Sequence, residues 1–182
     1  MNTALAQAAL PTARAIRWAP AAALSGVLLG AAVLARSTDG PANMLVATAA
    51  AGLAATVVSG LYDPAESLLA AVPVSAMQRR VLRLALLGLP VLAVWSVFDW
   101  LTVAQVSGPG PLLALTACGV AVALWGPRRN AVLLGVSTPV VLCALPRVLP
   151  SAAFSDVAAW WLTDPWWVLL GATLLCIAGR RR

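Results

Sequence analysis

Few residues of this 182-residue chain have the chemistry of an active site. The sequence contains no His, and all 12 of its basic residues are Arg. Histidine carries out most acid–base catalysis near neutral pH, and Schiff-base and P-loop chemistry both need Lys. The motifs H-E-x-x-H and G-x-S-x-G are absent as well. The sequence therefore predicts a protein that is not an enzyme.

The three cysteines also point to no reactive or metal-binding site. Cys118, Cys143 and Cys176 stand far apart inside apolar runs, and none forms a C-x-x-C pair. We interpret them as small apolar residues of helices rather than as disulfide partners or metal ligands. No metal ion and no other cofactor is predicted.

Two carboxylates lie beside tryptophans within apolar runs. Asp99 has Trp100 next to it and Trp95 one helical turn earlier, and Asp164 precedes Pro165. Because a carboxylate at the centre of a bilayer costs ~2.5–3.5 kcal/mol, such residues need a function or a position near the interface. One interpretation is a pathway for a cationic substrate or a proton, lined by these aspartates and tryptophans. The other is a helix cap at Asp164-Pro165 and an interfacial belt of indole rings.

The composition identifies the class of protein. Apolar residues make up 62% of the chain and charged residues 10%, with a mean hydropathy of +0.91. Soluble domains are ~45–50% apolar and ~25% charged. A water-soluble fold of this size cannot bury so much apolar surface. The sequence therefore predicts an integral membrane protein and excludes a soluble enzyme or a nucleic-acid-binding domain.

Six apolar stretches approach the ~20 residues that a membrane-spanning helix needs. Turn sequences such as Asp39-Gly40-Pro41 and Gly126-Pro127 separate them, and no soluble domain fits between them. We therefore predict an all-α protein with a single transmembrane domain, residues 1–182. The six expected spans are Trp18–Ala35, Asn43–Tyr62, Leu84–Val106, Leu112–Trp125, Ala131–Pro146 and Ala158–Ala178.

The arginines predict the orientation of these spans. With the N-terminus inside, only Arg36 and Arg147 lie in outer segments. Ten lie in inner segments: Arg14, Arg17, Arg79, Arg80, Arg83, Arg128, Arg129, Arg180, Arg181 and Arg182. This asymmetry follows the positive-inside rule and predicts a cytoplasmic-membrane protein with both termini in the cytoplasm. The net charge of +6 is then explained by topology and by contacts with anionic lipid heads, without a nucleic acid.

Tryptophans give an independent indication of the same orientation. Trp18 and Trp125 fall at inner ends of spans, and the other six fall near outer ends.

The N-terminus leaves one alternative open. Arg14 and Arg17, an apolar run and Val33-Leu34-Ala35 are also typical of a cleaved secretory signal. Cleavage would leave five spans in the same orientation, while a chain that keeps Met1 has six.

The connection between the second and third spans has the most defined pattern of all the connections. Asp63-Pro64-Ala65-Glu66 is typical of a helix start, with Asp63 as N-cap and Glu66 closing a capping box. Pro73 ends that helix, and Ser75 with Gln78 begins the next one. We therefore predict a short amphipathic helix over Pro64–Ala71, a break, and a second helix that enters the third span.

The run from Asp63 to Ser75, followed by Arg79 and Arg80, resembles the segment after the second span of type-2 ABC exporter permeases. That segment has an acidic residue, a Leu-rich helix, a Leu-Pro-Val-Ser sequence and basic residues. Here Val72 replaces the Leu before Pro73, and the chain is shorter than most members. The motif covers about 20 residues, and the likeness in topology covers the whole chain.

The resemblance implies a permease with six spans and a coupling helix that binds a cytoplasmic ATP-hydrolysing subunit. It also implies that Ser151–Thr163 forms a short re-entrant element before the sixth span. The expected docking residues are Asp63, Glu66, Pro73, Ser75, Arg79 and Arg80. The permease would pair with a second copy or a related chain and contact membrane lipids.

Gly26 and Gly30 form a G-x-x-x-G pattern that suits either such pairing or internal packing.

Two other functions remain open. One is the substrate-binding membrane subunit of an energy-coupling-factor type importer, and the other is a structural or regulatory membrane protein.

Overall fold

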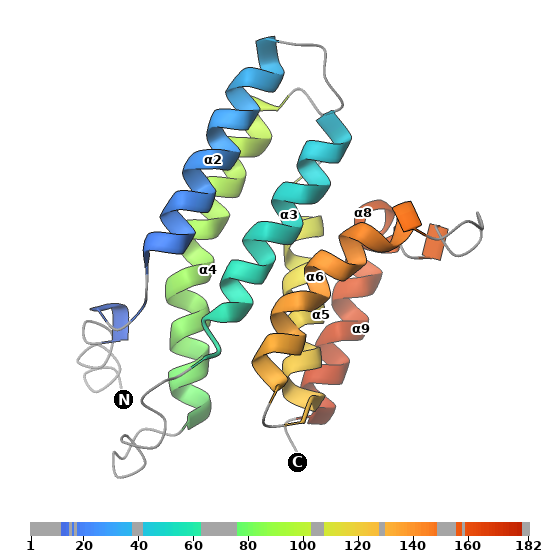
Figure 1. Ribbon diagram of the computed structural model, residues 1–182. Coiled ribbons are helices and arrows are strands. Elements are labelled where there is room, and N and C mark those ends of the chain that lie inside the picture. The colour runs from blue at the N-terminus through green and yellow to red at the C-terminus, as the bar shows by residue number, and fades with distance from the viewer. Residues whose placement is uncertain are drawn as a thin grey trace.

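The computed structural model of the protein describes residues 12–14, 16, 18–37, 42–62, 76–102, 108–127, 130–148, 156–157 and 159–179. In these ranges the regular structure is entirely helical (Figure 1). Four of the expected docking residues, Asp63, Glu66, Pro73 and Ser75, lie outside the described residues, as does the expected helix Pro64–Ala71. The same holds for Ser151–Ser155 of the expected re-entrant element.

Helices α2, α3 and α4 form the first half of the molecule. They span Trp18–Ser37, Ala42–Ser59 and Ala76–Leu101. Helix α4 is the longest, with 26 residues, and contains Pro90. It begins one residue after Ser75, where the sequence predicts a helix start.

Helices α5, α6, α8 and α9 form the second half. They span Gly110–Trp125, Ala131–Val148, Trp160–Thr163 and Pro165–Gly179. Pro111 lies in the first turn of α5, where its missing N–H costs no helical hydrogen bond. Gly126 ends α5 in an extended conformation, and its N–H donates to the Val122 carbonyl at 2.8 Å.

Helix α3 lies at the centre of the packing. It contacts α2, α4, α5 and α6, while α5 also contacts α6, α8 and α9 (Figure 1). Alanines allow this central position, because small side chains let helix axes approach closely. Ala49, Ala50 and Ala54 of α3 are fully buried.

Helices α5 and α9 run in the same direction and are in contact at both ends. A side chain on Gly110, at the start of α5, would meet Pro165 at the start of α9. At the other end the indole N–H of Trp125 donates to the Leu175 carbonyl at 2.9 Å. A Cβ atom on Gly179 would lie 2.8 Å from Nε1 of the same indole. The tryptophan thus joins the last turns of the two helices.

We expect Trp125→Phe to lower the free energy of unfolding by about 1 kcal/mol, the usual net contribution of one hydrogen bond. The measurement is an unfolding titration of purified protein in sodium dodecyl sulfate. Trp18→Phe is the matched control, because the indole N–H of Trp18 donates locally, to Ala13 of the neighbouring turn. A loss for Trp125→Phe no larger than for the control would contradict this role.

The outer surface of the helices is apolar, whereas the outer surface of a soluble protein carries mainly polar and charged side chains. Large apolar side chains such as Leu34, Leu89, Leu133 and Ile177 are exposed along four different helices. Threonine hydroxyls on these helices donate to the carbonyl four residues earlier, as Thr173 does to Leu169. Polar groups satisfied within their own helix and apolar side chains on the outside suit a lipid environment.

Three helices are long and apolar enough to cross a membrane, namely α2, α4 and α6. Helices α3, α5 and α9 contribute shorter apolar stretches, namely Met44–Ser59, Gly110–Trp125 and Pro165–Gly179. The fold is therefore that of a helical membrane protein with three helices of full spanning length in the described part of the chain.

Candidate functional site

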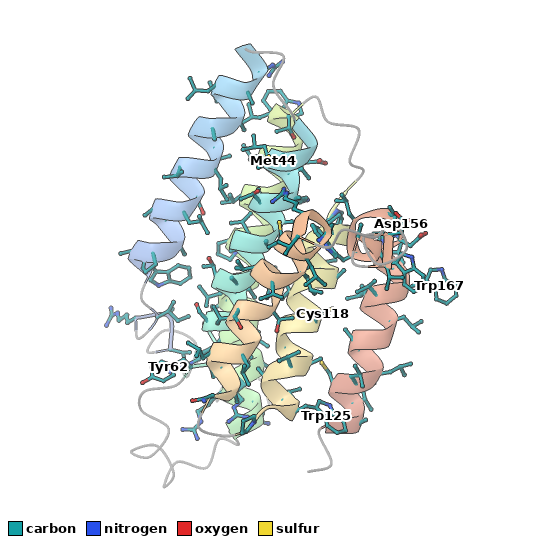
Figure 2. The ribbon with its side chains drawn as sticks, turned by 45° about the vertical axis from the view of Figure 1, so that its right-hand side comes forward. Met44, Tyr62, Cys118, Trp125, Asp156 and Trp167 are labelled. Atoms are coloured by element: carbon teal, nitrogen blue, oxygen red, sulfur yellow. The ribbon has the colours of Figure 1, made fainter. Side chains whose placement is uncertain are left out.

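The expected site residues lie at opposite ends of the helix bundle. We call the end that holds Tyr62, Trp125 and the first turns of α4 the arginine end. We call the end that holds Asp156, Trp167 and the last turn of α4 the tryptophan end. Figure 2 shows Tyr62 and Trp125 toward the first end and Asp156 and Trp167 toward the other.

The arginine end is built around Arg83 of α4. Only 7% of this residue is exposed, and its Nη1 donates to the backbone carbonyl of Tyr62 at 2.8 Å. Tyr62 follows the last turn of α3, where three successive backbone N–H groups bond three residues back. A buried guanidinium therefore ties the end of α3 to the second turn of α4. Sequence reasoning counted Arg83 only as an orientation signal, because burial of an arginine is not visible in a sequence.

This contact holds Tyr62, the residue before the 13-residue connection to Ala76, against the second turn of α4. Because α3 and α4 pack together, a connection of about 2–8 residues would join them. The connection in this chain, with 13 residues, is longer than that. Arg79 and Arg80 lie half-buried in the first turns of α4. Of the six expected docking residues, the structure describes only Arg79 and Arg80.

The tryptophan end is organised by the turn before α5. Gly108 adopts a φ of +84°, a conformation that strains any residue with a side chain. Its carbonyl accepts the indole N–H of Trp95 at 3.1 Å, and its own N–H donates to the Asp99 carboxylate. Two residues one turn apart on α4 therefore hold both polar groups of the glycine. Trp95 also stacks on Phe98, with ring centroids 5.8 Å apart.

Two of the four expected pathway residues, Trp95 and Asp99, thus contact the Gly108 turn. Trp95 is 1% exposed and belongs to the core, so it is not part of an interfacial belt. Trp161 is buried as well, which corrects the expectation that all six tryptophans near this end form the belt. The remaining four, Trp100, Trp160, Trp166 and Trp167, are exposed.

The other two expected pathway residues lie at the surface. Trp100 receives the Arg36 guanidinium of α2 over its ring, 5.8 Å from the centroid, so this pair joins α2 to α4. Asp164 is exposed and separates α8 from α9, and its carbonyl accepts the N–H of Trp167. The contact of Gly110 with Pro165 brings the start of α9 beside the Gly108 turn. No hydrogen bond joins the two aspartates among the described residues.

We expect Asp99→Leu to lower the free energy of unfolding by about 1–3 kcal/mol, because the Gly108 N–H loses its acceptor. Asp99→Asn keeps a carbonyl oxygen in nearly the same place and should lose much less. The two variants are compared by unfolding titration in sodium dodecyl sulfate. Equal losses for both would show that the charge of Asp99, and not its contact with Gly108, is what matters.

The described residues contain no group of three or more His, Cys, Asp and Glu side chains that could hold a metal ion. Comparison of the chain with models of known families, with curated proteins and with solved structures finds no match.

Proposed function

We propose that this chain is the membrane-spanning permease subunit of an ABC-type exporter. It would move a hydrophobic or amphipathic substrate with energy from ATP that a separate cytoplasmic subunit hydrolyses. The chain has no P-loop and no Lys, so a partner must supply the ATPase. The observation that carries the proposal is the anchored connection between α3 and α4.

The anchoring by Arg83 supports a docking role for residues 63–75. A segment that merely joined two packed helices would need neither this length nor a buried guanidinium at its base. A segment fixed at both ends transmits a push from a bound partner to α3 and α4 together. Helix α3 in turn contacts α2, α5 and α6, so the motion would reach most of the bundle.

The proposal includes six spans with both termini in the cytoplasm. Helices α3, α5 and α9 are then short spans that stand beside the three longer ones. The arginine end faces the cytoplasm, as the distribution of arginines predicts. A cytoplasmic position of this end is what an ATP-hydrolysing partner requires.

A second permease chain would complete the pathway, either a second copy or a related subunit. Gly26 and Gly30 of α2 support this pairing, because nothing in the described part of the chain lies within 4 Å of a Cβ atom built on either. The G-x-x-x-G pattern is therefore not used for packing within the described bundle. Such a glycine pair lets the backbone of another helix approach closely.

The test is purification of the tagged protein from its native host in mild detergent, followed by identification of the proteins that accompany it. We expect a P-loop ATPase with the wild type. We expect it to be lost with Glu66→Ala and with the double variant Arg79→Ala/Arg80→Ala. Matched controls from the tryptophan end are Asp156→Ala and the double variant Arg36→Ala/Arg147→Ala, which should retain the ATPase.

Each other outcome has a defined meaning. An ATPase that all variants retain would keep the transporter class and place the docking site elsewhere. Absence of any ATPase, under conditions in which known complexes of the same host survive, would contradict the exporter. The importer subunit and the structural protein would then be the readings to pursue.

A further inference from the structure

One side of the molecule is shorter than an ordinary bilayer. Helices α5 and α9 have 16 and 15 residues, which correspond to about 24 Å and 22 Å. The hydrocarbon core of a typical bilayer is about 30 Å thick. Helix α2, on the opposite side in Figure 1, has 20 residues and is about 30 Å long, which matches that thickness.

The two short helices cannot compensate for one another. They run in parallel with both pairs of ends in contact, Gly110 at Pro165 and Trp125 at Gly179, so neither extends beyond the other. Tilting the pair would shorten its reach across the membrane further. Charged residues bound α9 on both sides, because Asp164 precedes it and three arginines follow it.

Exposed aromatic residues lie at both ends of this short side. Trp166 and Trp167 are exposed at the start of α9, and Trp125 is half-exposed at the end of α5. Indole rings prefer the boundary between lipid headgroups and hydrocarbon. Because Trp125 lies beside Leu175 and Gly179 of α9, these rings are separated along the helix by less than the 15 residues of α9, and they mark the two boundaries beside α5 and α9.

The exposed face of α9 suits acyl chains better than another helix. Its exposed side chains are mostly large, namely Trp166, Trp167, Leu170, Leu174, Leu175 and Ile177. Helix pairs in membranes use small residues at their contacts, so that the backbones approach closely. A face of bulky side chains instead remains in contact with lipid.

We propose that the α5–α9 side thins the bilayer around it, and that the molecule selects lipids with short acyl chains there. A span that is too short draws the two lipid boundaries together or gathers lipids that already match it. The ligand is thus a phospholipid with chains shorter than the common 18 carbons. This inference rests on the six-span topology of the proposed function and does not depend on an ATPase.

The test uses purified protein in vesicles of phosphatidylcholine with monounsaturated chains of 14, 16, 18, 20 or 22 carbons. Each is mixed with its brominated analogue, and quenching of tryptophan fluorescence gives the relative lipid affinity. We expect the affinity to peak at 14–16 carbons and to exceed that for 20 carbons by about twofold or more. X-ray scattering should show 18-carbon bilayers becoming thinner as the protein-to-lipid ratio rises.

A lengthened variant provides the matched comparison. The triple variant Arg180→Leu/Arg181→Leu/Arg182→Leu adds three apolar residues after α9 and should shift the preferred chain length toward 18 carbons. The triple Arg→Gln variant removes the same charges without lengthening the apolar stretch, and it should keep the preference of the wild type.

Two results would overturn the inference. One is a wild-type affinity that is greatest at 18 carbons or more, with no thinning by X-ray scattering. The other is energy transfer between labelled copies that increases with chain length while the bilayer keeps its thickness, because a second copy would then cover this side. The measurement needs no ATPase, so its failure leaves the co-purification result standing, and loss of the ATPase leaves the lipid result standing.

Discussion

Gly135→Leu should prevent the stable packing of α5 and α6 and lower the free energy of unfolding by about 3 kcal/mol or more. A Cβ atom on Gly135 would lie 2.7 Å from the Gly119 carbonyl oxygen and 2.7 Å from the Ala123 Cβ. The obstacle is backbone and a methyl group that cannot turn away. Because Val58 of α3 also lies within 3.2 Å, the change would disturb the contact of three helices.

The chain contains matched controls for this substitution. No atom of the described residues lies within 4 Å of a Cβ atom on Gly88 of α4 or on Gly171 of α9. Leucine at either position should change the free energy of unfolding by less than about 1 kcal/mol, since leucine also favours the helix over glycine. Unfolding titrations of the three variants in sodium dodecyl sulfate decide the matter. A Gly135→Leu variant as stable as the two controls would contradict the close approach of α5 and α6.

Arg83→Met should have the second largest effect, a loss of about 1.5–3 kcal/mol, the range for hydrogen bonds to charged groups. Methionine keeps much of the apolar stem but leaves the Tyr62 carbonyl without its donor. The end of α3 is then no longer held to the second turn of α4. We therefore expect a loss of the co-purifying ATPase even under conditions in which the helices remain folded.

Arg36→Met is the control for this change. Arg36 is exposed and lies over the ring of Trp100, a contact worth about 0.5–1 kcal/mol at an exposed site. Unfolding titrations and the co-purification assay are run on both variants. If Arg83→Met were no more damaging than Arg36→Met in either assay, the anchoring role of Arg83 would be refuted.

The sequence predicted the helices well because their signals are local. Apolar composition, proline and glycine placed α2, α5 and α6 within about two residues of the observed bounds. The expected sixth span is different, because Asp164 interrupts it and α9 begins at Pro165 rather than at Ala158. Composition alone does not predict this break at Asp164, since tryptophans and leucines lie on both sides of it.

The contacts at both ends could not be predicted, because they join residues that are distant in the sequence. Arg83 reaches Tyr62 across 21 positions, and Trp125 reaches Leu175 across 50. The role of Gly108 depends on Trp95 and Asp99, which the sequence suggested as pathway residues instead. The expected and observed roles differ because the sequence does not show burial. A tryptophan near the end of a span has the same neighbours in the sequence whether its ring lies in an interfacial belt or in the core.

All of these proposals depend on the arginine end and the tryptophan end lying on opposite sides of the membrane. The most direct measurement is labelling of single cysteines with a membrane-impermeant maleimide in intact cells. The background carries Cys118→Ala, Cys143→Ala and Cys176→Ala, and the exposed positions Tyr62, Asn130 and Asp156 receive cysteine one at a time. We predict that Asp156→Cys is labelled in intact cells, and Tyr62→Cys and Asn130→Cys only after permeabilisation. Labelling of Tyr62→Cys and Asp156→Cys from the same side would contradict the topology and the docking surface that depends on it.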